Sequence, residues 1–109
     1  MTKTQAFEKF KKEFKKWQHI LQLDGYQIYF ELIDLKNEYA RIIVKEEIKT
    51  ARVEVDKKSI FDMSKTTAKH EACHLFLGKL NHLAHCRSVG EGEIEQEWEK
   101  LSNILEKVL

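Results

Sequence analysis

The spacing of the apolar residues changes twice along this chain of 109 residues, and that change limits the folds open to it. Near the N-terminus, apolar residues recur at intervals of three and four, which predicts an amphipathic helix with lysines on its other face. These residues are Phe7, Phe10, Phe14, Trp17 and Leu21. Thr2 with Gln5, or Thr4, can cap the start of this helix, and Asp24 with Gly25 can close it.

The middle of the chain has a different pattern. Three runs, residues 26–35, 39–48 and 51–56, alternate loosely and are rich in aromatic and β-branched side chains. Residues 36–37 and 49–50 fit the turns between them. We therefore expect a small, mostly antiparallel sheet of three strands.

The helical period returns after Ser64, which can cap a long helix from about residue 65 to 86. Residues 88–92 hold two of the four glycines and predict a short break. A last helix is expected from about 93 to 108, with its apolar residues inward. These are Ile94, Trp98, Leu101, Leu105 and Val108. The order of helix, three strands, helix and helix predicts an α+β fold, formed by a single domain over residues 1–109.

Length and composition exclude several classes of protein. A chain of this length buries one modest core, so a large substrate cleft between two lobes is not expected. With 42% hydrophobic and 34% charged residues, the composition is that of a soluble globular protein. No apolar stretch could span a bilayer and the start has no apolar signal segment, so we expect a cytoplasmic protein. Cys73 and Cys86 would lie about 20 Å apart on one helix, too far for a disulfide.

The net charge of +1 gives the whole molecule no strong attraction to nucleic acid, but the charge is unevenly distributed. Residues 1–22 contain six lysines and two glutamates, a balance of +4, whereas residues 90–109 contain six glutamates and two lysines, a balance of −4. Solvated helix faces, or two neighbouring helices, explain this pattern. The alternative is a basic helix that contacts nucleic acid or an acidic partner. Its lysines would be Lys9, Lys11, Lys12, Lys15 and Lys16.

The run His70-Glu71-Ala72-Cys73-His74 contains candidate metal-binding and catalytic residues. Histidines four residues apart lie one above the other on a helix, so both imidazoles can bind one zinc ion. Glu71 points about 100° away around the helix, where it can act as a general base on water activated by the metal. On a helical wheel, the two histidines border an expected buried face formed by Cys73, Phe76, Leu77, Leu80 and Ala84. The alternative is two half-buried histidines beside a surface glutamate.

Zinc needs a third protein ligand and, for catalysis, an open fourth position. Glu97 is the one carboxylate within the expected last helix on its inward side, and a buried carboxylate is costly unless it is paired or binds a metal. Glu93 is the next candidate, although a glutamate at a helix start also favours the dipole. Glu91 fits a solvated face.

The remaining candidate groups have more ordinary interpretations. His85 would lie about 16 Å further along the helix than His74, and His82 points away, so both are expected at the surface or behind the ligands. Cys73 is interpreted as a small buried hydrophobe, with a ligand role as the minor alternative. Tyr39 and Arg87 are weaker candidates for stabilising an oxyanion.

The motif followed by Glu97 resembles the zincin metallopeptidases, and within them the gluzincins, in the short "minimal zincin" form of small bacterial and phage proteins. The resemblance implies His70, His74 and Glu97 as zinc ligands and Glu71 as the base. It also implies an edge strand beside the cleft, where an extended peptide substrate adds as a further strand, and residues 51–56 are expected to be that edge.

The metzincin branch is excluded, because it would need Gly and His where this chain has Leu77 and Leu80. No Asp follows Glu97 to support a histidine ligand, which leaves Asp62 or Asp34 for that role. Three functions remain: a zinc peptidase, a zinc-binding interaction module without turnover, and a nucleic-acid-associated protein that uses its basic helix.

Overall fold

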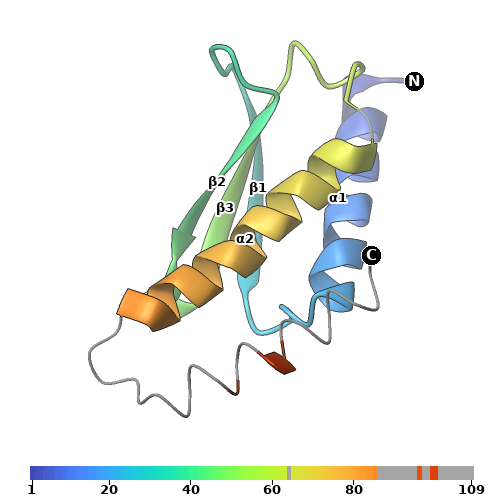
Figure 1. Cartoon of the computed structure of the whole chain (residues 1–109). Helices are drawn as coiled ribbons and strands as arrows, with labels where there is room; N and C mark the ends of the chain where they lie inside the picture. The colour runs from blue at the N-terminus through green and yellow to red at the C-terminus, as the bar shows by residue number, and fades with distance from the viewer. Residues whose placement is uncertain (64, 86–95, 97–98, 101–109) are drawn as a thin grey trace.

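The computed structural model describes residues 1–63, 65–85, 96, 99 and 100, and has an α+β fold with two helices on one face of a three-stranded sheet (Figure 1). The elements are α1 (Lys3–Ile20), β1 (Gln27–Ile33), β2 (Ala40–Lys45), the 3-10 helix η1 (Glu46–Ile48), β3 (Thr50–Asp56) and α2 (Lys65–His85). The strand ends differ from the predicted ones by at most three residues. The expected cap at Ser64, the break at 88–92 and the last helix lie outside the described residues, except for Gln96, Glu99 and Lys100, which are helical.

The start of α1 confirms the predicted capping box. The Thr2 hydroxyl accepts from the Gln5 backbone N–H at 3.1 Å, and the Gln5 side chain accepts from the Thr2 N–H at 2.9 Å. The end of the helix differs from the prediction, because the left-handed residue is Gln22, with φ 57°, rather than Gly25. The buried amide of Gln18 fixes this turn by donating to the carbonyl oxygens of Leu23 and Tyr26 at 2.9 and 3.1 Å.

The strand order is β1-β3-β2, with β1 parallel and β2 antiparallel to β3. The sheet is therefore mixed, and the prediction of a mostly antiparallel sheet was wrong. Residues 51–56 are also not the predicted edge, because β3 is the central strand. Its residues Val53, Glu54, Val55 and Asp56 are all buried, whereas Arg52 is exposed on the face away from the helices.

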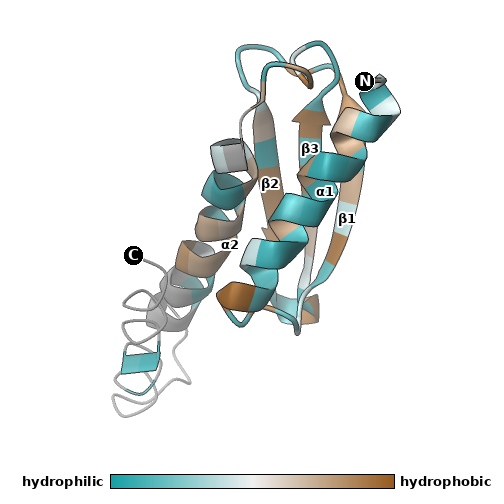
Figure 2. Cartoon of the chain, turned by 90° about the vertical axis from the view of Figure 1, so that its right-hand side faces the viewer, coloured by the Kyte–Doolittle hydropathy of each residue, from teal (hydrophilic) through white to brown (hydrophobic). Residues whose placement is uncertain are grey.

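One apolar core lies between the sheet and the helices. Val53 and Val55 of β3 are fully buried, and Phe14 of α1 packs edge-to-face on Phe30 of β1 with 5.4 Å between ring centroids. The outer face of α1 is largely hydrophilic (Figure 2). None of the helices in the described residues is long and apolar enough to cross a membrane. The arrangement leaves α2 beside β2, at one edge of the sheet.

Candidate metal centre

The two histidines of the motif meet on the exposed side of α2. Their Nε2 atoms are 2.9 Å apart, and the rings are almost perpendicular with centroids 4.5 Å apart. Two imidazoles on one tetrahedral zinc ion, each about 2.05 Å from it, hold their nitrogens about 3.3 Å apart. A separation of about 0.4 Å more would thus admit the ion, and the nitrogen donors are of the type that zinc prefers. The residues present therefore fit two ligands of a zinc site.

Glu71 lies between this exposed side and the core, with 6% of its surface exposed. Burial raises the pKa of its carboxyl group, and the nearby charge of Glu38 acts in the same direction. The positive charge of protonated His74 and His70 opposes this shift. Raising the pKa makes the carboxylate a better proton acceptor, which suits the role of a general base.

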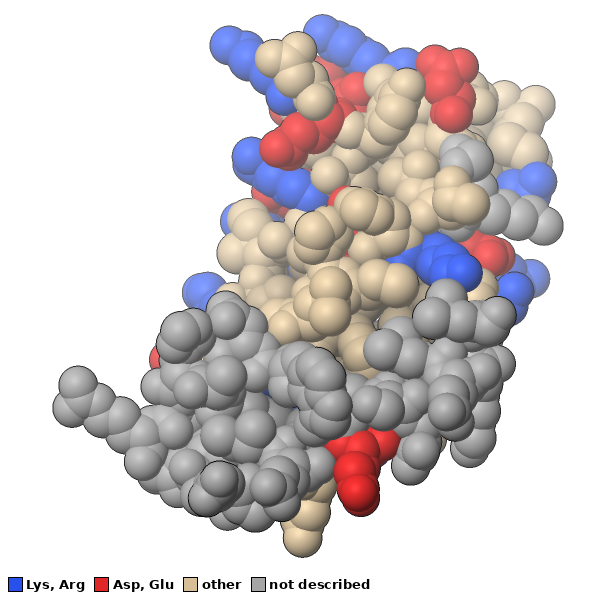
Figure 3. Space-filling model, in the orientation of Figure 1, with Lys and Arg blue, Asp and Glu red and all other residues tan. Residues whose placement is uncertain are grey.

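The buried side of α2 agrees only in part with the one that the helical wheel predicted. Phe76 is buried as expected, and the side chains of Leu80 and Ala84 are not described. Ala72, Leu75 and Phe76 are buried, whereas Leu77 is 56% exposed and Cys73 is only partly buried. The wheel gave the largest side chains the inward positions, but α2 packs against α1, and an alanine such as Ala72 lets two helices approach closely. The histidines consequently face away from the core, and both are exposed. The described part of the face shown in Figure 3 carries few charges near its centre.

A groove of about 650 Å³ runs between α2 and β2, and the motif forms one of its walls. The lining residues are Glu38, Tyr39, Ala40, Arg41, Ile42, Thr66, Thr67, His70, Glu71 and His74. An open groove of this size can hold several residues of an extended peptide. Of the weaker sequence candidates, Tyr39 lines this groove and is exposed, so it can contact a ligand there.

Among the described residues, edge strand β2 has backbone groups that do not pair with β3. The Asp56 N–H donates to the Tyr39 carbonyl oxygen at 2.8 Å, so Tyr39 forms a hydrogen-bonded pair with β3. In an antiparallel ladder such pairs alternate, so Arg41 and Ile43 also bond to β3, while the backbone of Ala40 and Ile42 points away from it. Because β2 is the last strand of the sheet on this side, those groups can pair with an added strand.

Several predicted site residues cannot be placed. Glu97, Glu93, Glu91 and Arg87 lie outside the described residues, and the side chain of His85 is likewise not described. His82 is exposed on α2, as expected for a surface residue. Within the described part of the chain, no three His, Cys, Asp or Glu side chains are grouped to hold a metal ion. The third ligand therefore stays a prediction.

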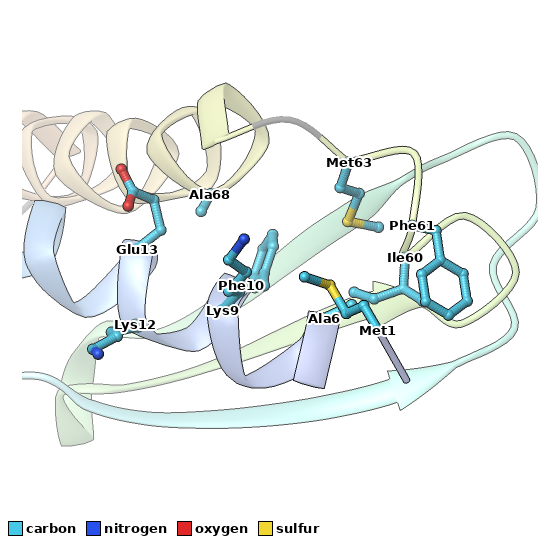
Figure 4. Close-up of a pocket in the computed structure, with 10 residues that line it drawn as sticks. All are labelled: Met1, Ala6, Lys9, Phe10, Lys12, Glu13, Ile60, Phe61, Met63 and Ala68. Carbon is cyan, nitrogen blue, oxygen red and sulfur yellow. The ribbon is translucent and has the colours of Figure 1, made fainter. Parts of the chain in front are cut away.

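Sequence reasoning did not single out Glu38, which lies two residues before β2 and lines the groove. Its proximity depends on how β2 lies beside α2, so the sequence carries no local signal for it. A second cavity, of about 380 Å³, lies between the start of α1, the connector that follows β3 and the start of α2 (Figure 4). Apolar side chains such as Phe10, Ile60 and Met63 line it, and its described lining residues include no histidine or cysteine.

Comparisons with protein-family models, with curated proteins and with solved structures give no match to this chain.

Proposed function

We propose that this protein is a zinc-dependent peptidase of the gluzincin-like, minimal zincin type. The observation that carries the proposal is the meeting of the His70 and His74 nitrogens at 2.9 Å beside the buried carboxylate of Glu71. His70 and His74 would hold the ion, and Glu97 remains the proposed third ligand. The groove that these residues line has a volume of about 650 Å³, enough for a segment of a peptide chain.

Bound zinc supplies Lewis-acid chemistry, because it lowers the pKa of water and polarises a carbonyl group. The residues of this chain transfer the proton and bind the substrate. Glu71 accepts a proton from the attacking water as its oxygen adds to the carbonyl carbon, and then delivers that proton to the leaving nitrogen as the C–N bond breaks. The products are one carboxylic acid and one amine, so the reaction consumes one water.

The substrate strand would lie along β2 instead of the central strand β3. Ala40 and Ile42 each offer one N–H and one carbonyl oxygen away from β3, and both residues line the groove. A peptide paired with these groups is held extended, with its backbone fixed relative to His70 and Glu71 across the groove.

Exchange of Glu71 for glutamine tests the role of the base. The Glu71→Gln variant should bind as much zinc as the wild type but hydrolyse a mixed peptide library at least about 100-fold more slowly, because the amide accepts no proton. Glu31→Gln, an exposed position on β1, is the matched control and should keep full activity. Unchanged turnover in Glu71→Gln would refute the mechanism. A wild type that binds zinc and cleaves no peptide would instead be a zinc-binding module without turnover.

A second function is favoured by the lysines of α1. Lys11 and Lys16 are paired with Glu8 and Glu13 at 3.1 and 3.7 Å. Lys9, Lys12 and Lys15 form no ion pair with the described residues, and all three line a shallow groove along the helix. Such an unpaired stripe can contact nucleic-acid phosphates. Affinity for a duplex or single strand should then fall steeply as salt is raised, and a flat salt dependence would exclude this function.

A further inference from the structure

One carboxylate in the lining of the groove between α2 and β2, that of Glu38, can bind a ligand. Glu38 lines the groove beside the start of β2, and its side chain is exposed. No ion pair joins Glu38 to any cation of the described residues. Glu71, the other acidic residue of the lining, is buried and is used by the proposed reaction.

Among the described residues of the lining, Arg41 is the one lysine or arginine, and it already binds another carboxylate. Nε of Arg41 donates to Oε1 of Glu54 at 2.6 Å, and that glutamate is almost fully buried on the face of the sheet away from the helices. Arg52 lies 3.9 Å from the other oxygen of the same carboxylate. The pKa of Arg41 is raised mainly by Glu54 and to a smaller extent by the charge of Glu38, but no ion pair joins Glu38 to Arg41. The carboxylate oxygens of Glu38 can therefore still accept from a cationic ligand.

We infer that the groove selects peptides with lysine or arginine close to the bond to be cleaved, and that Glu38 binds this cation. The inference rests on the proposed peptidase function and names its substrate class. Glu38 lies two residues before Ala40, whose backbone would pair with the substrate, so their Cα atoms are at most about 7 Å apart. The cationic side chain is thus expected within about two residues of the one paired with Ala40. The exposed ring of Tyr39, in the same lining, can contact the aliphatic stem of that side chain.

The test measures binding separately from hydrolysis. Zinc-loaded Glu71→Gln protein is titrated into fluorescein-labelled, alanine-rich peptides that carry one Arg, Gln or Glu at each position in turn, and anisotropy is recorded. Arg peptides are expected to bind about fivefold more tightly than Gln peptides at their best position, and Glu peptides more weakly than either. The preference should shrink in 0.5 M salt, because the pair is exposed.

Variants of Glu38 in the same background identify the residue responsible. Glu38→Gln should abolish the preference for Arg, and Glu38→Lys should reverse it in favour of Glu. Glu31→Gln, on the other face of the sheet, should keep it. Thermal melting confirms that each variant is folded. An Arg preference that survives Glu38→Lys, or its absence from the parent protein, would overturn the inference.

Failure of the inference and failure of the proposed function give different results. Hydrolysis of the library by the wild type without any preference for Arg or Lys would refute the role of Glu38 and leave the peptidase function standing. Selective, Glu38-dependent binding without hydrolysis by the wild type would refute the peptidase function and leave a zinc module that binds basic peptides.

Discussion

The imidazoles of His70 and His74 owe their position to one turn of helix, and Glu71 owes its environment to the neighbouring core. The position of the histidines follows from the local sequence pattern, whereas the environment of Glu71 depends on contacts between distant parts of the chain. Spacing of four residues was enough to place both nitrogens on one side of α2, 2.9 Å apart. Which side of α2 is buried depends on contacts with α1 and β2, so the sequence pattern misplaced Leu77, which is exposed.

Cys73 lies within the motif and provides a test of the ligand set. It is partly buried against the core rather than fully enclosed, and its side chain is small. Cys73→Ala should therefore keep the zinc content of the wild type and lower the free energy of unfolding by only about 1 kcal/mol. Metal content and chemical denaturation measure the two quantities. Loss of zinc in this variant would make the thiolate a ligand.

Asp56 at the end of β3 makes the stability depend on pH. The backbone N–H of Leu35 and the hydroxyl of Ser59 donate to its carboxylate, and these bonds hold its pKa below the ordinary value of 3.8. A group with a lower pKa in the folded state stabilises the fold above its unfolded pKa, and this contribution is lost as the pH falls through the folded pKa.

We expect Asp56→Asn to melt at a lower temperature than the wild type at pH 7, with a difference that shrinks below about pH 4. Melting followed by circular dichroism between pH 2.5 and 7 measures it. The exposed Asp62→Asn is the matched control and should track the wild type throughout. A difference between Asp56→Asn and the wild type that stays constant down to pH 2.5 would contradict the assignment.

At the scale of elements, β2 is the strand that defines the groove. The sequence predicted α1, three strands and the extent of α2, because each depends on local periodicity and capping. It did not predict the order β1-β3-β2, since strand pairing joins residues far apart in the chain and the alternation in 51–56 is equally compatible with an edge or a central position. The structure, and not the sequence, therefore identifies β2 as the edge strand beside α2.

Proline substitutions separate the two sides of β2. Ala40→Pro removes an N–H that points away from β3, at the first residue of an edge strand, where proline is tolerated. This variant should stay folded but lose affinity for the peptide strand, seen as a higher KM. Ile43→Pro removes an N–H that bonds to β3 and should lower the melting temperature markedly. An unchanged KM for a folded Ala40→Pro protein would argue against strand addition on β2.

At the scale of the whole molecule, the expected ion would join α2 to the segment around Glu97, 12 residues beyond the end of the helix. If the ligands come from α2 and from the region of Glu97, zinc binds the folded chain and stabilises it by about 4 kcal/mol at a thousand times its Kd. Removing zinc with EDTA should then lower the melting temperature by about 10 °C or more. The double variant His70→Ala, His74→Ala should melt at one temperature with or without EDTA. A wild type whose melting temperature is insensitive to EDTA would oppose this coupling.

Metal content tests the central claim most directly. Wild type, Glu97→Ala and the control Glu99→Ala, whose side chain is exposed, would be purified without added metal and measured by inductively coupled plasma mass spectrometry. We predict one zinc per chain in the wild type and in Glu99→Ala, and little or none in Glu97→Ala. Absence of zinc from all three, even after incubation with zinc, would make His70 and His74 ordinary helix residues and contradict the proposed metal centre.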